Sequence, residues 1–157
     1  MNPAAVGSAI FFLVGPGLEA GVAPWVLTGF EVREEWALPL RGLGVLLIAG
    51  GLVVVLDCFR RFVVEGLGTP APSAPPAVLV VRGAYRFVRN PMYVATAAVI
   101  AGEGLVLGQP ILLIGAALYC VALACLVRFY EERVMRERFG EEYDDYRARV
   151  PAWIPGT

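Results

Sequence analysis

The sequence predicts an all-α, polytopic integral membrane protein with about four transmembrane helices and a C-terminal interfacial helix. Of its 157 residues, 58% are hydrophobic and only 17% are charged, whereas a soluble domain carries roughly 25% charged residues. Four long apolar runs would leave too little polar chain to coat them in water. The charged residues instead gather between these runs and after the last one. The length suits one domain, spanning residues 1–157.

The two leading helices are expected within residues 1–60. The first apolar stretch, at about 3–30, has a Gly-Pro-Gly break at 15–17, so it fits either one kinked helix or two half-length helices. Its start lacks a basic region and a clear cleavage site, so we expect a retained span rather than a signal peptide. The second stretch, at about 38–59, contains the uncharged run LGVLLIAGGLVVVL and predicts one transmembrane helix.

A helical hairpin is predicted between residues 90 and 127. The only charged residue inside it is Glu103, and Gly-Gln-Pro at 108–110 divides the run into two arms near the short end of the ~17–25 residues that cross a bilayer. Asn90 before Pro91 predicts the start of the first arm, because asparagine can cap free backbone N–H groups and proline is preorganised for the first turn. The preceding TPAPSAPP at 69–76 predicts an extended, semi-rigid linker.

The charged C-terminal region is expected to leave the membrane and continue along its surface as a helix. Its apolar residues recur at helical intervals and would share one face. These residues are Val127, Tyr130, Val134, Met135 and Phe139. Gly140 predicts a break, followed by a short acidic-then-basic helix that ends at 150–151.

The arginines predict the orientation of the spans. The 13 basic residues are all arginine, and most lie at 60–61, 82–89 and 128–149, beside the ends of apolar runs. The positive-inside rule places these segments, and with them both termini, on the cytoplasmic side. The same rule accounts for the basic clusters without nucleic acid, so we expect no nucleic-acid partner.

The residue types also limit the chemistry. The chain has no histidine, and Cys58, Cys120 and Cys125 lie in apolar stretches, so we expect no metal site and interpret the cysteines as packing residues. Without histidine, the usual Ser-His and Cys-His arrangements are excluded. Catalysis would have to use carboxylates, tyrosines, arginines or a cofactor that is already reactive.

Two clusters are candidate sites. In GAYRFVRNPMY at 83–93, arginines beside a helix N-terminus could bind an anion, or the arginines could be topological anchors and the tyrosines an interfacial belt. In the second cluster, Arg128 is at helical spacing from Glu131 and Glu132. This cluster could be a surface ion pair worth ~0.5 kcal/mol or less, or carboxylates at the membrane border that hold a cationic ligand.

Other acidic residues have simpler interpretations. Glu19 and Glu103 lie within apolar spans, where a carboxylate is costly unless it is protonated, paired, or facing a cavity or water. We assign neither of them a catalytic role. Asp57 and Glu65 flank two arginines at 60–61, and local pairing at the interface is expected.

Three segments together resemble the isoprenylcysteine carboxyl methyltransferase family and the related membrane phospholipid methyltransferases. In order, they are GTPAP, RGAYRFVRNPMY at 82–93 and EERVMRERFGEEYDDYRARVPAWIP at 131–155. The resemblance covers about 66–155, which it implies is the cofactor-binding and catalytic region, and residues 1–60 are more weakly similar to the leading transmembrane helices of bacterial members. Many members have histidine where this chain has Asn90, so a proton-transfer role is not expected there.

The resemblance implies an S-adenosylmethionine-dependent methyltransferase that acts on a lipophilic acceptor and releases S-adenosylhomocysteine. It implies carboxyl O-methylation of the isoprenylcysteine type, with the site on the cytoplasmic side. The arginine-only set of basic residues is typical of a GC-rich genome and favours a bacterial inner membrane. The alternatives are N-methylation of a phospholipid or amine, and a non-enzymatic transporter or scaffold. The implied cofactor-binding residues are Tyr85, Arg89, Asn90, Pro91, Tyr93, Glu131 and Glu132. The implied catalytic residues are Arg128, Arg86 and Glu132, with Tyr143 and Tyr146 packing a C-terminal lid.

Overall fold

The computed structural model describes residues 3–33, 36–65 and 76–156, and every regular element within them is helical. This confirms the predicted all-α class. The α-helices are α1 (Pro3–Val14), α2 (Ala23–Thr28), α3 (Leu38–Val64), α4 (Pro91–Leu107), α5 (Pro110–Leu126), α6 (Glu132–Phe139) and α7 (Glu141–Arg149). Two π-helices, η1 (Leu18–Val22) and η3 (Val127–Glu131), and a 3-10 helix, η2 (Gly83–Arg86), complete the order. The predicted proline-rich linker lies outside the described residues except for its last position.

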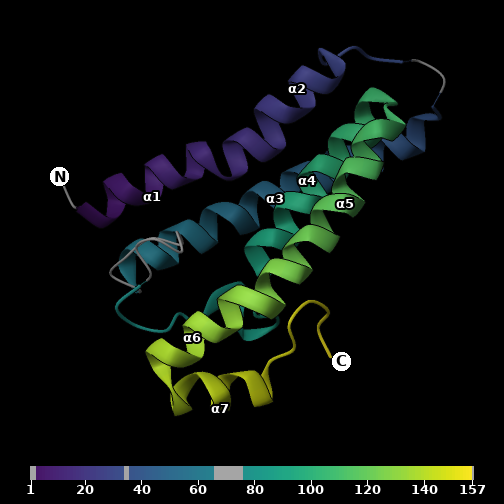
Figure 1. The fold of residues 1–157 in the computed structure, drawn as a ribbon. Coiled ribbons are helices and arrows are strands. Elements are labelled where there is room, and N and C mark those ends of the chain that lie inside the picture. The colour runs from purple at the N-terminus through teal and green to yellow at the C-terminus, as the bar shows by residue number, and fades with distance from the viewer. Residues whose placement is uncertain (1–2, 34–35, 66–75, 157) are drawn as a thin grey trace.

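The first apolar stretch forms one helical run rather than two separate half-length helices. The chain passes from α1 through η1 into α2, and Val6–Thr28 is long and apolar enough to cross a membrane. The Gly-Pro-Gly sequence at 15–17 lies directly before the π-helical segment η1. Proline has no backbone N–H to donate, so it removes one helical hydrogen bond there and favours a local departure from α-helical geometry. In Figure 1 this run lies along one side of the other helices.

Two further helices have the length and composition of a span, and a fourth is shorter. The two long helices are α3, with 27 residues, and the run Pro110–Phe139, with 30 residues. The shorter apolar helix is α4, with 17 residues. The hairpin turn at 108–110 is confirmed. The four apolar helices of the prediction are thus present, and three of them meet the length expected of a transmembrane helix.

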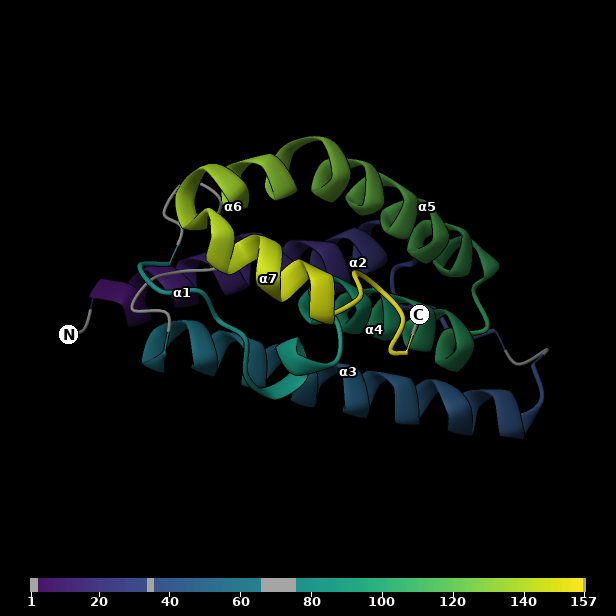
Figure 2. The same cartoon turned by 90° about the horizontal axis from the view of Figure 1, so that it is seen from below.

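The charged C-terminal region continues the last apolar helix beyond Val127, as the helical spacing of its apolar residues predicts. α5, η3 and α6 form one uninterrupted helical run, and the chain turns only at Gly140, where φ is 54°. α7 then folds back from the end of α6, as Figures 1 and 2 show. The predicted break and the end of α7 before residues 150–151 are confirmed.

Glycines bring α3 and α4 into close contact. A Cβ on Gly44 would lie 2.6 Å from the Gly102 carbonyl oxygen, and a Cβ on Gly51 would lie 2.7 Å from the Ala95 carbonyl oxygen. Small residues at such positions let helix backbones approach each other within a membrane. The contact fixes the start of α4, and therefore the cluster at 83–93, against α3.

We expect Gly51→Ala to lower the free energy of unfolding by about 1–3 kcal/mol, because the added methyl group would overlap the α4 backbone. Gly50 is the matched control, since a Cβ there meets nothing within 4 Å. Gly50→Ala should be neutral or stabilising, because alanine is the better helix former. Reversible unfolding in mixed micelles measures both, and equal effects of the two substitutions would contradict the packing.

The local ion pairs at the end of α3 are confirmed. Arg61 contacts Asp57 at 2.7 Å and Glu65 at 2.8 Å, and Arg60 lies 3.6 Å from Asp57. The interpretation of the cysteines is only partly correct, because Cys58 is buried whereas two cysteines on α5, at 120 and 125, are exposed.

Candidate functional site

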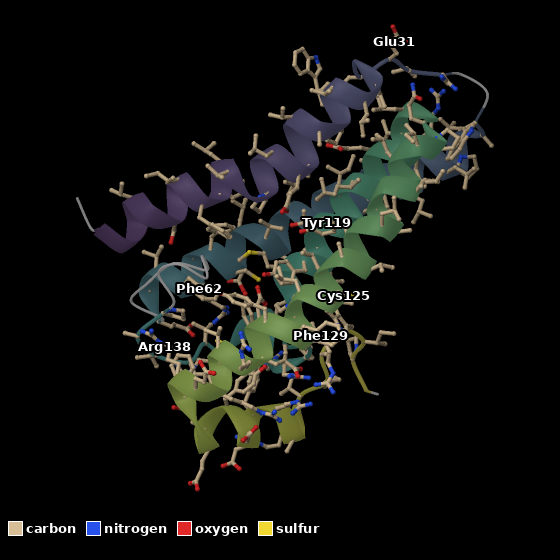
Figure 3. All side chains as sticks on the ribbon, viewed as in Figure 1. Glu31, Phe62, Tyr119, Cys125, Phe129 and Arg138 are labelled. Carbon is tan, nitrogen blue, oxygen red and sulfur yellow. The ribbon has the colours of Figure 1, made fainter. Side chains whose placement is uncertain are left out.

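A cavity lies at the end of the bundle where α6 and α7 meet the segment before α4. Figure 3 shows Phe62 of α3 and Arg138 of α6 at this end and Glu31 at the opposite end. The polar lining groups come from three tyrosines at 85, 93 and 143 and from Arg89, Asn90 and Glu131, among others. The remaining walls are mainly apolar, including Phe11, Phe62, Leu79, Val80, Met92, Val127, Val134 and Met135.

Contacts with α3 and α7 fix Tyr85 in the lining of the cavity. Its ring packs edge-on against Phe62 of α3, with ring centroids 5.8 Å apart. The Tyr146 hydroxyl of α7 donates a hydrogen bond of 2.6 Å to the Tyr85 carbonyl oxygen. Burial raises the pKa of both tyrosines above the ordinary range, so both hydroxyls stay protonated at neutral pH.

Asn90 precedes α4 as predicted, but it does not cap the helix with its side chain. Helix α4 begins at Pro91, and no side-chain capping hydrogen bond is present at its N-terminus. The Asn90 amide instead donates to the Ala152 carbonyl oxygen at 3.1 Å. The backbone N–H groups of Arg89 and Asn90 donate to Pro151 and Ala152. A cap would use the side-chain oxygen of Asn90 as an acceptor, but the bond from its N–H₂ group to Ala152 orients the side chain toward the C-terminal segment.

Tyr93 and Glu131 connect the two predicted clusters. The Tyr93 hydroxyl on α4 donates a hydrogen bond to a carboxylate oxygen of Glu131, and both residues line the cavity. Glu131 is the last residue of the π-helix η3. Of the two acidic residues at helical spacing from Arg128, the arginine contacts Glu132, at the i, i+4 spacing of a helical ion pair.

Glu132 is buried behind the cavity wall, where it faces three arginines. Its side chain is 7% exposed, and it accepts a hydrogen bond of 2.9 Å from Arg89, whose side chain is 10% exposed. Its other oxygen lies 3.7 Å from Arg128 and 3.5 Å from Arg147 of α7. Arg89 also donates to the Tyr143 hydroxyl at 3.2 Å. The Glu132 carboxylate therefore fixes the position of the Arg89 guanidinium beside the cavity.

The other candidate residues lie outside the lining. The Arg128 side chain is 68% exposed, and Arg86 is exposed with its guanidinium 4.5 Å from the centre of the Phe87 ring. Pro91 is buried at the start of α4. Of the candidates, Tyr85, Arg89, Asn90, Tyr93 and Glu131 line the cavity, whereas Pro91, Glu132, Arg128 and Arg86 do not.

Sequence reasoning missed the contribution of α7 to the polar network. Tyr143 and Tyr146 do pack, but Tyr143 also contacts Arg89, and Arg147 contacts Glu132. These three residues are at the i, i+3 and i+4 spacing that places side chains on one helix face. That spacing on a short charged helix was the signal that could have identified them.

The acidic residues within the spans have different surroundings. Glu19, in η1, accepts a hydrogen bond of 2.9 Å from the Tyr119 hydroxyl of α5. One carboxylate oxygen of Glu103 is buried, with no hydrogen-bond partner among the described residues. Neither residue lines the cavity. Within residues 3–33, 36–65 and 76–156, no three histidine, cysteine or acidic side chains cluster as metal ligands.

The cavity can bind an amphiphile that carries both charges. Arg89 offers hydrogen-bond donors to an anionic group, and Glu131 offers an acceptor to a cationic group. Aromatic and aliphatic side chains form the rest of the cavity lining. Its volume of about 130 Å³ is below the ~300–1,000 Å³ of typical small-molecule sites. A ligand the size of a nucleoside therefore requires the walls to move apart.

Comparison with known proteins places this geometry in a family. Residues 40–142 match the phospholipid methyltransferase family. The chain is similar to the protein-S-isoprenylcysteine O-methyltransferases of Rattus norvegicus and Homo sapiens, at 28% identity over 92% of this chain and 54% of each relative. The protein of the same name from Schizosaccharomyces pombe is 31% identical over 80% of this chain and 51% of the relative. No solved structure matches the chain.

The chain spans about half the length of these relatives. The matched region nevertheless runs from the start of α3 into α7 and contains both clusters that meet at the cavity, at 83–93 and 128–132. The resemblance seen in the sequence is thereby confirmed, and the chain belongs to the phospholipid methyltransferase family.

Proposed function

We propose that the protein is an integral membrane methyltransferase that uses S-adenosylmethionine to methylate a lipophilic acceptor. The observation that carries the proposal is the cavity at which Tyr93 meets Glu131 and Arg89 meets Glu132, two contacts that join the family-matched clusters. The helical spans supply the membrane setting.

The donor groups suit this cofactor, which combines a carboxylate, an ammonium group and a sulfonium centre. Arg89 would bind the carboxylate, because guanidinium forms strong charge-assisted hydrogen bonds with carboxylates. Glu131 would accept from the ammonium group or a ribose hydroxyl, and the aromatic rings of Tyr85 and Tyr93 would pack on the apolar and cationic parts. Asn90 would line the pocket beside them. When bound, the cofactor supplies a methyl group that is already electrophilic.

Glu132 and Pro91 would act through neighbours. Glu132 would hold the Arg89 guanidinium toward the cavity, and Pro91 would fix the start of α4 from which Asn90 and Tyr93 project. Arg128 and Arg86 are exposed beside these residues and are the candidates for orienting an anionic acceptor at the rim. None of these roles requires a titrating base.

A carboxylate is the acceptor that best suits these residues, as in isoprenylcysteine-type O-methylation. In that transfer the carbon–sulfur bond breaks as a carbon–oxygen bond forms, and the positive and negative charges cancel without a proton transfer. The absence of histidine is then no obstacle, because the rate depends on positioning the acceptor against the methyl group and on excluding water. An amine acceptor would release a proton, for which Glu131 is the one carboxylate in the lining. N-methylation of a phospholipid or amine is therefore the second candidate.

The proposal places the site at the cytoplasmic face of a bacterial inner membrane. The arginines at 60–61, 82–89 and 128–149 cluster at the cavity end of the bundle, and the positive-inside rule assigns such clusters to the cytoplasmic side. A cofactor made in the cytosol would then reach the cavity without crossing the bilayer.

Incubation of the purified protein with methyl-labelled S-adenosylmethionine and a membrane extract tests the proposal. We expect label in the lipid fraction that base releases as volatile methanol, because methyl esters hydrolyse. Label that resists base would favour the amine acceptor. Neither transfer nor calorimetric binding of S-adenosylhomocysteine would refute the enzyme and leave a transporter or scaffold role.

A further inference from the structure

A second hollow lies on the other side of Tyr93, between α4 and α5. This groove has a volume of about 390 Å³, within the ~300–1,000 Å³ range of small-molecule sites. Its lining is almost entirely apolar. The residues are Tyr93, Val94, Ala97, Tyr119, Cys120, Val121, Leu123, Ala124, Trp153 and Ile154.

Tyr93 lines both the groove and the cavity. Its hydroxyl is hydrogen-bonded to Glu131, so its polar end belongs to the cavity while its ring helps to wall the groove. Among the described residues that line the groove, the other hydroxyl is on Tyr119, and it donates to Glu19. The groove therefore presents hydrocarbon and aromatic surface and no unpaired charged group.

The C-terminal segment forms a fixed wall of the groove. Trp153 and Ile154 line it, and they follow directly after Ala152, whose carbonyl oxygen accepts both the Asn90 side-chain amide at 3.1 Å and the Asn90 backbone N–H at 3.2 Å. Tyr143 and Tyr146 of α7, the helix that precedes this segment, line the cavity. Helix α7 thus borders the cavity, and the segment 150–154 that follows it, which we call the strap, borders the groove and is bonded to the residues just before α4.

We propose that this groove binds the apolar chain of the methyl acceptor, with the reacting head group directed past Tyr93 into the cavity. This rests on the proposed function, because it assigns the groove to the acceptor of that reaction. The occupant is a single hydrocarbon or isoprenoid chain, since α4, α5 and the strap border an apolar groove that shares the Tyr93 side chain with the charged cavity. Asn90 is then a positioning residue that keeps the strap against α4.

The groove can be filled without touching the cavity. Ala124 lines the groove, whereas Ala122 is exposed on the same helix and does not line it. Ala124→Phe would occupy the space that the chain needs, and Ala122→Phe is the matched control of equal size. Both variants should bind S-adenosylhomocysteine as the wild type does.

Steady-state kinetics with S-alkylated cysteine carboxylates of increasing isoprenoid chain length measures the effect. For the wild type and Ala122→Phe, KM should fall as the chain lengthens. In Ala124→Phe that dependence should flatten, and KM for the longest chain should rise about tenfold or more, as expected when a pocket loses room for several methylenes. An unchanged chain-length dependence in Ala124→Phe, with cofactor binding intact, would overturn the inference and leave the proposed function standing.

A photoreactive probe locates the chain even if no methyl is transferred. The probe is a long-chain carboxylate with a diazirine near the end of its chain, and the labelled peptide is identified by mass spectrometry. We expect saturable labelling at 121–124 or 153–154, reduced by unlabelled probe and by Ala124→Phe but not by Ala122→Phe. Labelling spread over α1 and α3, or displaced only by bulk phospholipid, would mean that ordinary membrane lipid fills the groove and would refute the inference.

Discussion

Replacement of Glu132 with alanine is expected to lower the free energy of unfolding by about 3–5 kcal/mol, the cost of removing one partner of a buried ion pair. The Glu132 and Arg89 side chains are only 7% and 10% exposed. Without the carboxylate, the Arg89 guanidinium would remain buried and hydrogen-bonded to the uncharged Tyr143 hydroxyl. Arg147 of α7 would also lose its contact with Glu132. Reversible unfolding in mixed micelles gives the value.

The matched control is Glu137→Ala in the same helix. Glu137 is 70% exposed and 3.9 Å from Arg133, and an exposed pair of this kind contributes ~0.5 kcal/mol or less. The double variant with Arg89→Ala should cost less than the sum of the two single variants, because the unpaired charge is then gone. If Glu132→Ala costs no more than Glu137→Ala, the buried network does not hold the site together.

Arg89→Lys is expected to weaken cofactor binding by about tenfold or more while costing less stability than Glu132→Ala. Lysine keeps the positive charge beside Glu132, but its compact ammonium group cannot reproduce the planar guanidinium, which contacts Glu132 and Tyr143 and would still offer donors to a carboxylate. Calorimetric titration with S-adenosylhomocysteine measures the affinity. Arg82→Lys, at an exposed position before η2, is the control and should bind normally; equal binding by both variants would remove Arg89 from the site.

The sequence predicted those features that depend on residues close together in the chain. The lengths of the apolar runs predicted the helices, Gly-Gln-Pro at 108–110 predicted the hairpin turn, and Gly140 predicted the break before α7. Each of these features depends on residues that are neighbours in the sequence. The meeting of the clusters at 83–93 and 128–132 rested on the family resemblance. The helical spacing of apolar residues between Val127 and Phe139 likewise predicted that the last apolar helix continues beyond Val127, as the run from α5 to α6 confirms.

Side-chain partners across the fold could not be read from the sequence. Asn90 was predicted to cap α4, but its side-chain N–H₂ group donates a hydrogen bond to the carbonyl oxygen of Ala152, far along the chain. Arg128 was expected at helical spacing from both Glu131 and Glu132; it contacts Glu132, whereas Glu131 accepts a hydrogen bond from Tyr93 of another helix. Such choices depend on where α7 and the strap return, which only the packed structure specifies.

The central claim is that Tyr93, Arg89 and Glu131 form one binding site for the sulfonium cofactor. Its most direct test is calorimetric titration of S-adenosylhomocysteine into the wild type and Glu131→Gln, with Glu103→Gln as the matched control, because Glu103 lies outside the cavity lining. We predict binding to the wild type and to Glu103→Gln, and an affinity lowered about tenfold in Glu131→Gln, where the carboxylate acceptor is lost. Binding to Glu131→Gln as tight as to the wild type would contradict the account.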